Sequence, residues 1–284
     1  MRLRARSRFN RPTGRRLAFA TLLACLSAAG SAYAAGPVTG GPNIYTGSFS
    51  IGGHPGTPAH PAPATLTETL SATSATQGDV AAPIVDIRTS VYGVRPNPRY
   101  FPKCTVGEIN GAGASTRTWN GVCPKGSLVA SGHVQAALTS PSANLAGPGT
   151  PCSLGLSAYN GGAGKLTLFF TMSPATCSGH TTGAAAAWSG TVSDKGGYLN
   201  TDIPEPPDVS YDAGNIGLFG SLESETLSFK RLTIRHDGRT IPFLESVGCS
   251  KRLRPYSVTY TATTSSTPSA ANESSATVTG SKGC

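Results

Sequence analysis

The sequence of 284 residues is 38% hydrophobic and 13% charged, with a formal net charge of +9. Such a charge would ordinarily indicate a nucleic-acid or anionic-surface partner, but 7 of the 23 basic residues, and no acidic residue, lie within Met1 to Arg16. Beyond that segment the chain has 16 basic and 14 acidic residues, or +2, a composition that excludes nucleic acid as the expected partner.

The first 34 residues are predicted to be a secretory signal peptide. The arginine-rich start is followed by an apolar or small-residue run from Leu17 to Ala29, and Ala32-Tyr33-Ala34 fits a small-x-small cleavage site. The apolar run is too short for a membrane span, and no other stretch comes close to one. We therefore expect a secreted or extracellular protein that has no transmembrane segment.

Two other forms of export stay open. Arg15-Arg16 resembles a twin-arginine pair, although no hydroxyl residue directly precedes it. Leu22-Leu23-Ala24-Cys25 resembles a lipoprotein cleavage box, which would anchor the protein to lipid through Cys25. Small and apolar residues continue past Cys25 to Ala35, which favours a signal peptide that ends at Ala34.

Six cysteines follow the signal peptide and predict three disulfides: Cys104, Cys123, Cys152, Cys177, Cys249 and Cys284. Pairing of consecutive cysteines is favoured, because each such pair brackets a local loop or hairpin. Each bridge would stabilise the fold by about 3 kcal/mol, mostly by restricting the unfolded chain. The sequence has no Cys-x-x-Cys spacing, so a metal site is not expected.

The segment from residue 35 to 64 is rich in Gly and Pro and is expected to be partly flexible, with one strand from Ile44 to Ile51. His54 and His60 lie in it without a carboxylate or third ligand nearby, which favours a connector over a surface metal site.

From Thr65 to Ala72 the chain alternates as a strand does, and Glu68 falls on the same face as Leu66 and Leu70. A charge on the apolar face predicts an edge strand, where an inward carboxylate discourages further pairing.

Pro83 to Val91 predicts a third strand, with Asp86 and Arg88 as solvated neighbours on its open face. Arg95-Pro96-Asn97-Pro98 then forces a turn or an extended corner. The loop from Cys104 to Cys123 is too polar and glycine-rich to form a core by itself.

Alternation returns from Ser127 to Leu138 and places His133 outward, where a lone histidine is more often without a role than catalytic. Between Cys152 and Cys177, two alternating runs flank Asn160-Gly161-Gly162-Ala163-Gly164, whose Asn-Gly opening favours a tight reversal. These runs predict a central β-hairpin.

Two later hairpins are predicted, with turns at Asp194-Lys195-Gly196-Gly197 and His236-Asp237-Gly238. A change of apolar phase after Phe229 predicts a β-bulge near Lys230. No stretch has helical periodicity, and the alanine run from Ala184 to Ala187 is too short to sustain a helix.

Two charged clusters are candidate sites. The acidic, proline-rich stretch from Asp202 to Asp212 is an arguable calcium site, but its spacing matches no known scheme and a solvent loop is favoured. Lys251, Arg252 and Arg254 predict a solvated basic corner that an anionic wall polymer could touch.

At the end of the chain, Tyr256 to Ala262 alternates as a strand does, and a short return strand precedes Cys284. Pairing of the two strands would bring Cys284 close to Cys249.

Several short motifs resemble those of a group of secreted, alanine- and glycine-rich bacterial proteins of β character: Cys123-Pro124-Lys125-Gly126-Ser127, Tyr159-Asn160-Gly161, Gly248-Cys249 and Arg254-Pro255-Tyr256-Ser257-Val258-Thr259. The resemblance implies an exported bacterial domain and carries over no site residues.

Together these patterns predict an all-β fold: an antiparallel β-sandwich or jelly roll of about a dozen short strands. Because no linker-like break divides residues 35 to 284, we expect one domain.

The sequence is consistent with three functional classes. The leading one is a non-enzymatic secreted or cell-envelope protein with a structural or interaction role and no cofactor or metal. The alternative is a carbohydrate-binding module for a glycan or cell-wall polymer, in which Trp119, Trp188 or Tyr159 stacks on sugars; against it, large aromatics more often belong to the core. A secreted hydrolase is the third, and it would need two carboxylates, or His133 and an acid, in one cleft. Neither Gly-x-Ser-x-Gly nor His-Glu-x-x-His is present.

Overall fold

The computed structural model describes residues 36–112, 122–172, 176–177, 183–184, 186–213 and 217–284. The predicted signal peptide and Trp119 lie outside these residues. Within them, no helix has both the length and the apolar character needed to cross a membrane.

Thirteen strands of the described chain form one sheet, here called the main sheet, in which every pairing is antiparallel. Across the sheet the order is β1 (Val38–Gly40), β2 (Asn43–Gly52), β4 (Thr65–Ser74), β13 (Phe219–Phe229), β7 (Leu128–Thr139), β8 (Thr150–Gly162), β9 (Lys165–Met172), β11 (Trp188–Lys195), β12 (Tyr198–Pro204), β5 (Ile84–Tyr92), β17 (Leu253–Thr263) and β18 (Glu273–Gly283), and β10 (Gly183–Ala184) pairs with β9.

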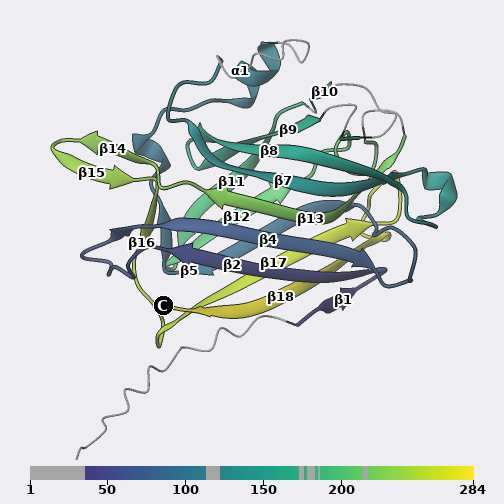
Figure 1. The fold of residues 1–284 in the computed structure, drawn as a ribbon, viewed down its shortest axis with the longest axis horizontal. Coiled ribbons are helices and arrows are strands. Elements are labelled where there is room, and N and C mark those ends of the chain that lie inside the picture. Colours follow the sequence, from purple (N-terminus) through teal and green to yellow (C-terminus); the bar gives the residue numbers. More distant parts are fainter. Residues whose placement is uncertain (1–35, 113–121, 173–175, 178–182, 185, 214–216) are drawn as a thin grey trace, which may run out of the picture.

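The main sheet curls until its two ends meet. At one end β1 and β2 contact β18, which is the last strand at the other end. In Figure 1, purple β2 and yellow β18 accordingly lie side by side. The result is a nearly closed, barrel-like sheet that encloses a hydrophobic core.

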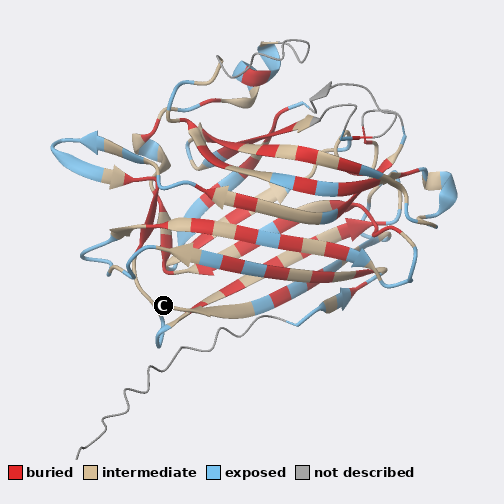
Figure 2. Ribbon diagram, in the orientation of Figure 1, coloured by how far each residue is buried: buried red, intermediate tan, exposed pale blue. Residues whose placement is uncertain are grey.

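The predicted antiparallel all-β fold with three disulfides is confirmed, and the cysteines pair consecutively: Cys104 with Cys123, Cys152 with Cys177, and Cys249 with Cys284. Alternation along the strands is equally clear, because buried and more exposed residues follow one another in most of them (Figure 2). Opposite parts of one curved sheet thus share a core, as the two sheets of a sandwich do.

The three predicted hairpins are present as β8–β9, β11–β12 and β14–β15. The reversal between β8 and β9 lies later than expected, because positive φ angles occur at Gly162, Ala163 and Gly164 and not at Asn160. Asn160 is instead a fully buried residue of β8. Its side chain has a different role, described below.

No bulge forms at Lys230. Instead β13 ends at Phe229, and the chain leaves the main sheet to form the hairpin of β14 (Thr233–His236) and β15 (Arg239–Pro242). The change of apolar phase therefore marks a change of sheet. The bulge of β13 lies earlier, between Leu222 and Ser224.

Short elements complete the fold beside the main sheet. A second small sheet contains β3 (Ala62–Pro63), β16 (Leu244–Ser246) and β6 (Val94–Pro96), and 3-10 turns occur at η1 (Pro98–Tyr100) and η3 (Pro141–Ala143). The expectation of no helix is wrong for α1 (Val106–Gly111). A capping box starts it: the Glu108 backbone N–H donates to the Thr105 hydroxyl, and the Glu108 carboxylate accepts from the Thr105 backbone.

The seam between the two ends of the main sheet is closed by tyrosine side chains. The Tyr260 hydroxyl on β17 donates to the Thr46 carbonyl of β2 at 2.7 Å, and the Tyr256 hydroxyl donates to the Gly47 carbonyl at 3.3 Å. The Tyr260 ring also stacks on Tyr45, with centroids 4.5 Å apart. Side-chain bonds and ring contacts thus join β17 to β2, which are not neighbours in the strand order.

We expect Tyr260→Phe to lower the free energy of unfolding by about 1–2 kcal/mol, because it leaves the Thr46 carbonyl without its donor while keeping the ring. Urea denaturation measures the change. Tyr92→Phe is the control, since the Tyr92 hydroxyl makes no hydrogen bond within the described chain, and it should change stability by less than about 0.5 kcal/mol. Equal effects of the two variants would contradict this role of the Tyr260 hydroxyl.

Candidate functional site

Three glutamates line the interior of the main sheet: Glu68 on β4, Glu225 on β13 and Glu205 just after β12. They are called the interior glutamates below. Glu68 is 6% exposed. The prediction of an edge strand is wrong, because β4 pairs with β2 on one side and β13 on the other. Its inward carboxyl faces a cavity and does not guard an edge.

The cavities beside the interior glutamates are small. One of about 30 Å³ is lined by all three glutamates and Trp188, and a second of about 40 Å³ shares Glu205 and Glu225. Such volumes admit a few water molecules and exclude a sugar ring. Two buried polar atoms here, Glu205 Oε2 and Trp188 Nε1, have no hydrogen-bond partner in the described chain.

Burial favours the uncharged form of the interior glutamates. It raises the pKa of Glu68 and of Glu205 well above the ordinary value, and the charge of Glu225 raises both further. Burial also raises the pKa of Glu225 to about 7.

Asp86, which interacts electrostatically with Glu205, is a further partly buried carboxyl. Burial raises its pKa to about 6, against the opposing effect of the Arg88 charge. The prediction of two solvated neighbours holds for Arg88, whose side chain is 62% exposed, but not for Asp86 at 13%.

The proposed aromatic sugar platform finds no open surface among the described residues. Trp188 is 7% exposed and packs edge-on against Phe170, with centroids 4.9 Å apart. Tyr159 is 5% exposed in a small cluster beside α1. Both rings lie where core residues lie, and their role in sugar binding stays a prediction.

Other predicted positions are dispersed. His133 faces outward, as expected, whereas Arg254 is 3% exposed and donates to the Ser246 hydroxyl at 2.7 Å. The predicted basic corner is therefore wrong for Arg254 and is limited to exposed Lys251 and Arg252. Within the described residues, no three His, Cys, Asp or Glu side chains gather as metal ligands would.

We expect Glu225→Gln to stabilise the protein at pH 7–8, by about 2 kcal/mol. The unfolded chain loses this proton near pH 4.5 and the folded chain near pH 7. This carboxyl therefore favours folding most below pH 4.5, and stability is lost as the pH rises through 7. Glutamine keeps the shape without the charge and should flatten the profile. Chemical denaturation from pH 4 to 8 provides the measurement.

The matched control for that measurement is Glu223→Gln, which removes the same charge from an exposed position of the same strand. Its stability profile should follow that of the natural protein. Parallel profiles for Glu225→Gln and the natural protein between pH 4 and 8 would show that Glu225 ionises as an ordinary surface carboxyl does.

A much larger recess opens on the surface between the β3–β16–β6 sheet and the β14–β15 hairpin. It has a volume of about 630 Å³, within the usual range of ligand pockets. Its lining includes three arginines from three elements: Arg95 on β6, Arg99 on η1 and Arg239 on β15. We call this recess the arginine cleft.

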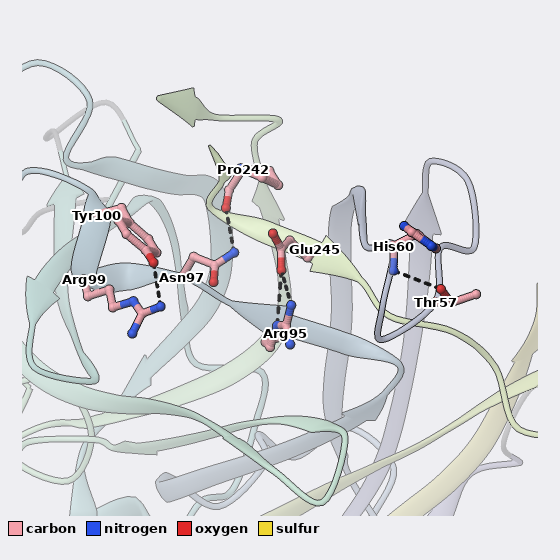
Figure 3. A network of polar contacts seen from close by, with 8 residues as sticks. All are labelled: Thr57, His60, Arg95, Asn97, Arg99, Tyr100, Pro242 and Glu245. Carbon is pink, nitrogen blue, oxygen red and sulfur yellow. Dashed lines mark hydrogen bonds and ion pairs between the residues drawn. The ribbon is translucent and has the colours of Figure 1, made fainter. Parts of the chain in front are cut away.

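Cross-strand and backbone contacts hold the walls of the arginine cleft together (Figure 3). Arg95 and Glu245 are register partners of β6 and β16, and two guanidinium nitrogens of Arg95 donate to Glu245 Oε2 at 2.7 and 3.1 Å. Beside them, the Asn97 amide donates to the Pro242 carbonyl at 3.0 Å. Residues about 150 positions apart thereby form one frame.

Asn160 of β8 holds η1, which forms part of the cleft lining, against the main sheet. Its side-chain amide donates to the carbonyls of Pro98, Phe101 and Pro102 at 3.0–3.1 Å. The prolines of the Arg95-Pro96-Asn97-Pro98 corner also restrict this segment, as the sequence predicted. Arg99 and Tyr100 are therefore presented from a fixed backbone.

The charged groups of the arginine cleft are not all engaged. Arg95 is paired with Glu245, whereas Arg99 lies over the Tyr100 ring at 4.5 Å and donates to the Tyr100 hydroxyl at 2.5 Å. The Arg239 side chain makes no hydrogen bond or ion pair within the described residues, although its backbone is part of the β14–β15 hairpin. The other acidic group of the lining is Asp194, at the β11 end.

Sequence reasoning placed Glu68 inward but missed Glu225 as an interior residue and Arg99 and Arg239 as lining of one recess. Glu225 shares the parity of Leu227 and Phe229, so continuing the alternation by two residues would have placed it inward. No comparable signal marked Arg99 and Arg239, which are 140 positions apart in the sequence and line the same recess from η1 and β15.

Comparison with known proteins leaves the chain without an assigned family: no family model and no curated protein sequence matches it. Its function must therefore be argued from these two places alone.

Proposed function

We propose that the protein is a non-enzymatic component of the cell exterior or envelope that binds a partner in the arginine cleft. The observation that carries this proposal is a recess of about 630 Å³ whose walls are tied by the Arg95–Glu245 and Asn97–Pro242 contacts. A site on such a frame binds without first having to order its walls, which lowers the entropic cost of binding.

Three disulfides support a location outside the cytoplasm, since such bonds persist in oxidising compartments. The first 34 residues also support export, because they combine an arginine-rich start, an apolar run and a small-x-small cleavage site. Release from the cell and a lipid anchor through Cys25 would each place the arginine cleft outside the cytoplasm.

The interior glutamates support a non-enzymatic role over a hydrolase. A glycosidase needs two carboxyls on either side of a bound sugar, several ångströms apart. Here the carboxyls face cavities of about 30 and 40 Å³, which no sugar enters. In the arginine cleft, the Glu245 carboxylate is already engaged by Arg95.

We expect the purified, oxidised chain from residue 36 onward to cosediment with insoluble cell-wall material, and Thr240→Trp to abolish cosedimentation. Thr240 lies on the exposed β15 and lines the arginine cleft, so an indole there fills the recess. Thr279→Trp, on the exposed face of β18, is the matched control and should cosediment as the natural protein does. Equal cosedimentation by both variants would show that the arginine cleft is not the binding site.

A further inference from the structure

We infer that the ligand of the arginine cleft is an anionic polymer whose carboxylate or phosphate groups are held by Arg99 and Arg239. This inference rests on the function proposed above and specifies the chemistry of its ligand. Three observations support it: two arginines have unpaired side-chain donors, the lining has few acidic groups to oppose them, and the Tyr100 ring is already covered by other side chains.

The free arginines are identified by their contacts. Arg95 uses two of its nitrogens on Glu245, an ion pair in which the side chains are 34% and 11% exposed, so it serves the frame. The Arg99 guanidinium donates one hydrogen bond to the Tyr100 hydroxyl, and Arg99 is exposed to solvent. Since a guanidinium has five N–H donors, Arg99 retains most of its fork for a ligand.

Arg239 supplies a second exposed guanidinium from another element. Planar guanidinium groups bind carboxylate and phosphate oxygens in pairs, more specifically than lysine does. Two such groups in one recess suit a ligand that repeats its charge along a chain. Once the Arg95–Glu245 pair is set aside, they face one acidic group of the lining, Asp194, so the recess favours anions.

Tyr100 argues against stacking on a neutral sugar as the main interaction. One guanidinium already lies over its ring, with the Arg99 carbon 4.5 Å from the centroid. The ring also contacts His236, with centroids 5.1 Å apart and planes tilted by 53°. Tyr100 therefore orients Arg99 over its ring and offers little open face of its own.

The rest of the lining is suited to an extended chain. Exposed Pro61 and half-buried Pro63 present rigid apolar surface in the lining without backbone donors of their own. A polymer backbone can lie along such walls while its charged groups reach the two arginines.

The test uses fluorescently labelled oligogalacturonate as the carboxylate probe, its methyl ester as the uncharged probe of the same backbone, and a glycerol-phosphate oligomer as the phosphate probe. Binding to the chain from residue 36 onward is followed by fluorescence anisotropy. We expect at least one anionic probe to bind, the ester to bind at least tenfold more weakly, and added salt to weaken binding because it screens exposed charges.

Arg99→Gln and Arg239→Gln should each weaken binding of the anionic probe by about tenfold, the usual effect of losing a hydrogen bond to a charged group. Arg99→Lys keeps the charge without the planar fork and should fall between Arg99→Gln and the natural protein. Arg252→Gln, at the exposed basic corner and outside the cleft lining, is the matched control and should bind as the natural protein does.

Three outcomes would overturn the inference: equal binding of the ester and the acid, a loss that follows Arg252→Gln and not the two cleft variants, or no binding of either anionic probe. Each leaves the proposed function to its own test, because cosedimentation that is lost in Thr240→Trp would still place a ligand in the cleft. The carboxylate and phosphate probes, compared with each other, identify the source of the charge.

Discussion

Closure of a single antiparallel sheet around carboxyl groups is the constraint on which the rest of this structure depends. A sheet whose two ends meet has an enclosed face, and every inward side chain must be apolar or uncharged there. The chain meets this requirement by alternation along its strands and by burial, which raises the pKa of each interior glutamate and so favours its uncharged form. At the seam, tyrosine hydroxyls from β17 reach the carbonyls of β2.

A closed interior leaves the periphery for function. Cavities of about 30 and 40 Å³ hold water at most, so the proposed binding function is assigned to the segments that leave the main sheet. Those segments are short and proline-rich and would be poorly ordered alone, yet Asn160 fixes η1 from the main sheet and Arg95 joins β6 to β16. The same closed sheet that excludes a ligand thus supplies the rigid base on which the arginine cleft is built.

Local features of this fold were predictable from the sequence, and distant ones were not. Hairpins and consecutive disulfides depend on alternation and turn residues within about 40 positions, and both were found. Strand order depends on partners far apart, as for Thr67 and Ser228, which are hydrogen-bonded across 161 positions. Glu68 shows the consequence: its inward direction was visible in the pattern, but the flanking strands that make it interior were not. Arg99 and Arg239 likewise line one recess although they are far apart in the sequence.

The most direct test of the closed, carboxyl-lined interior is an NMR titration of the glutamate side-chain carboxyl carbons in the oxidised protein. The account predicts that Glu225 titrates near pH 7, and that Glu68 and Glu205 titrate well above the ordinary value of 4.5 while the chain stays folded. Titration of all three near pH 4.5 would contradict it, since carboxyls that ionise as they do in water cannot lie inside a closed sheet.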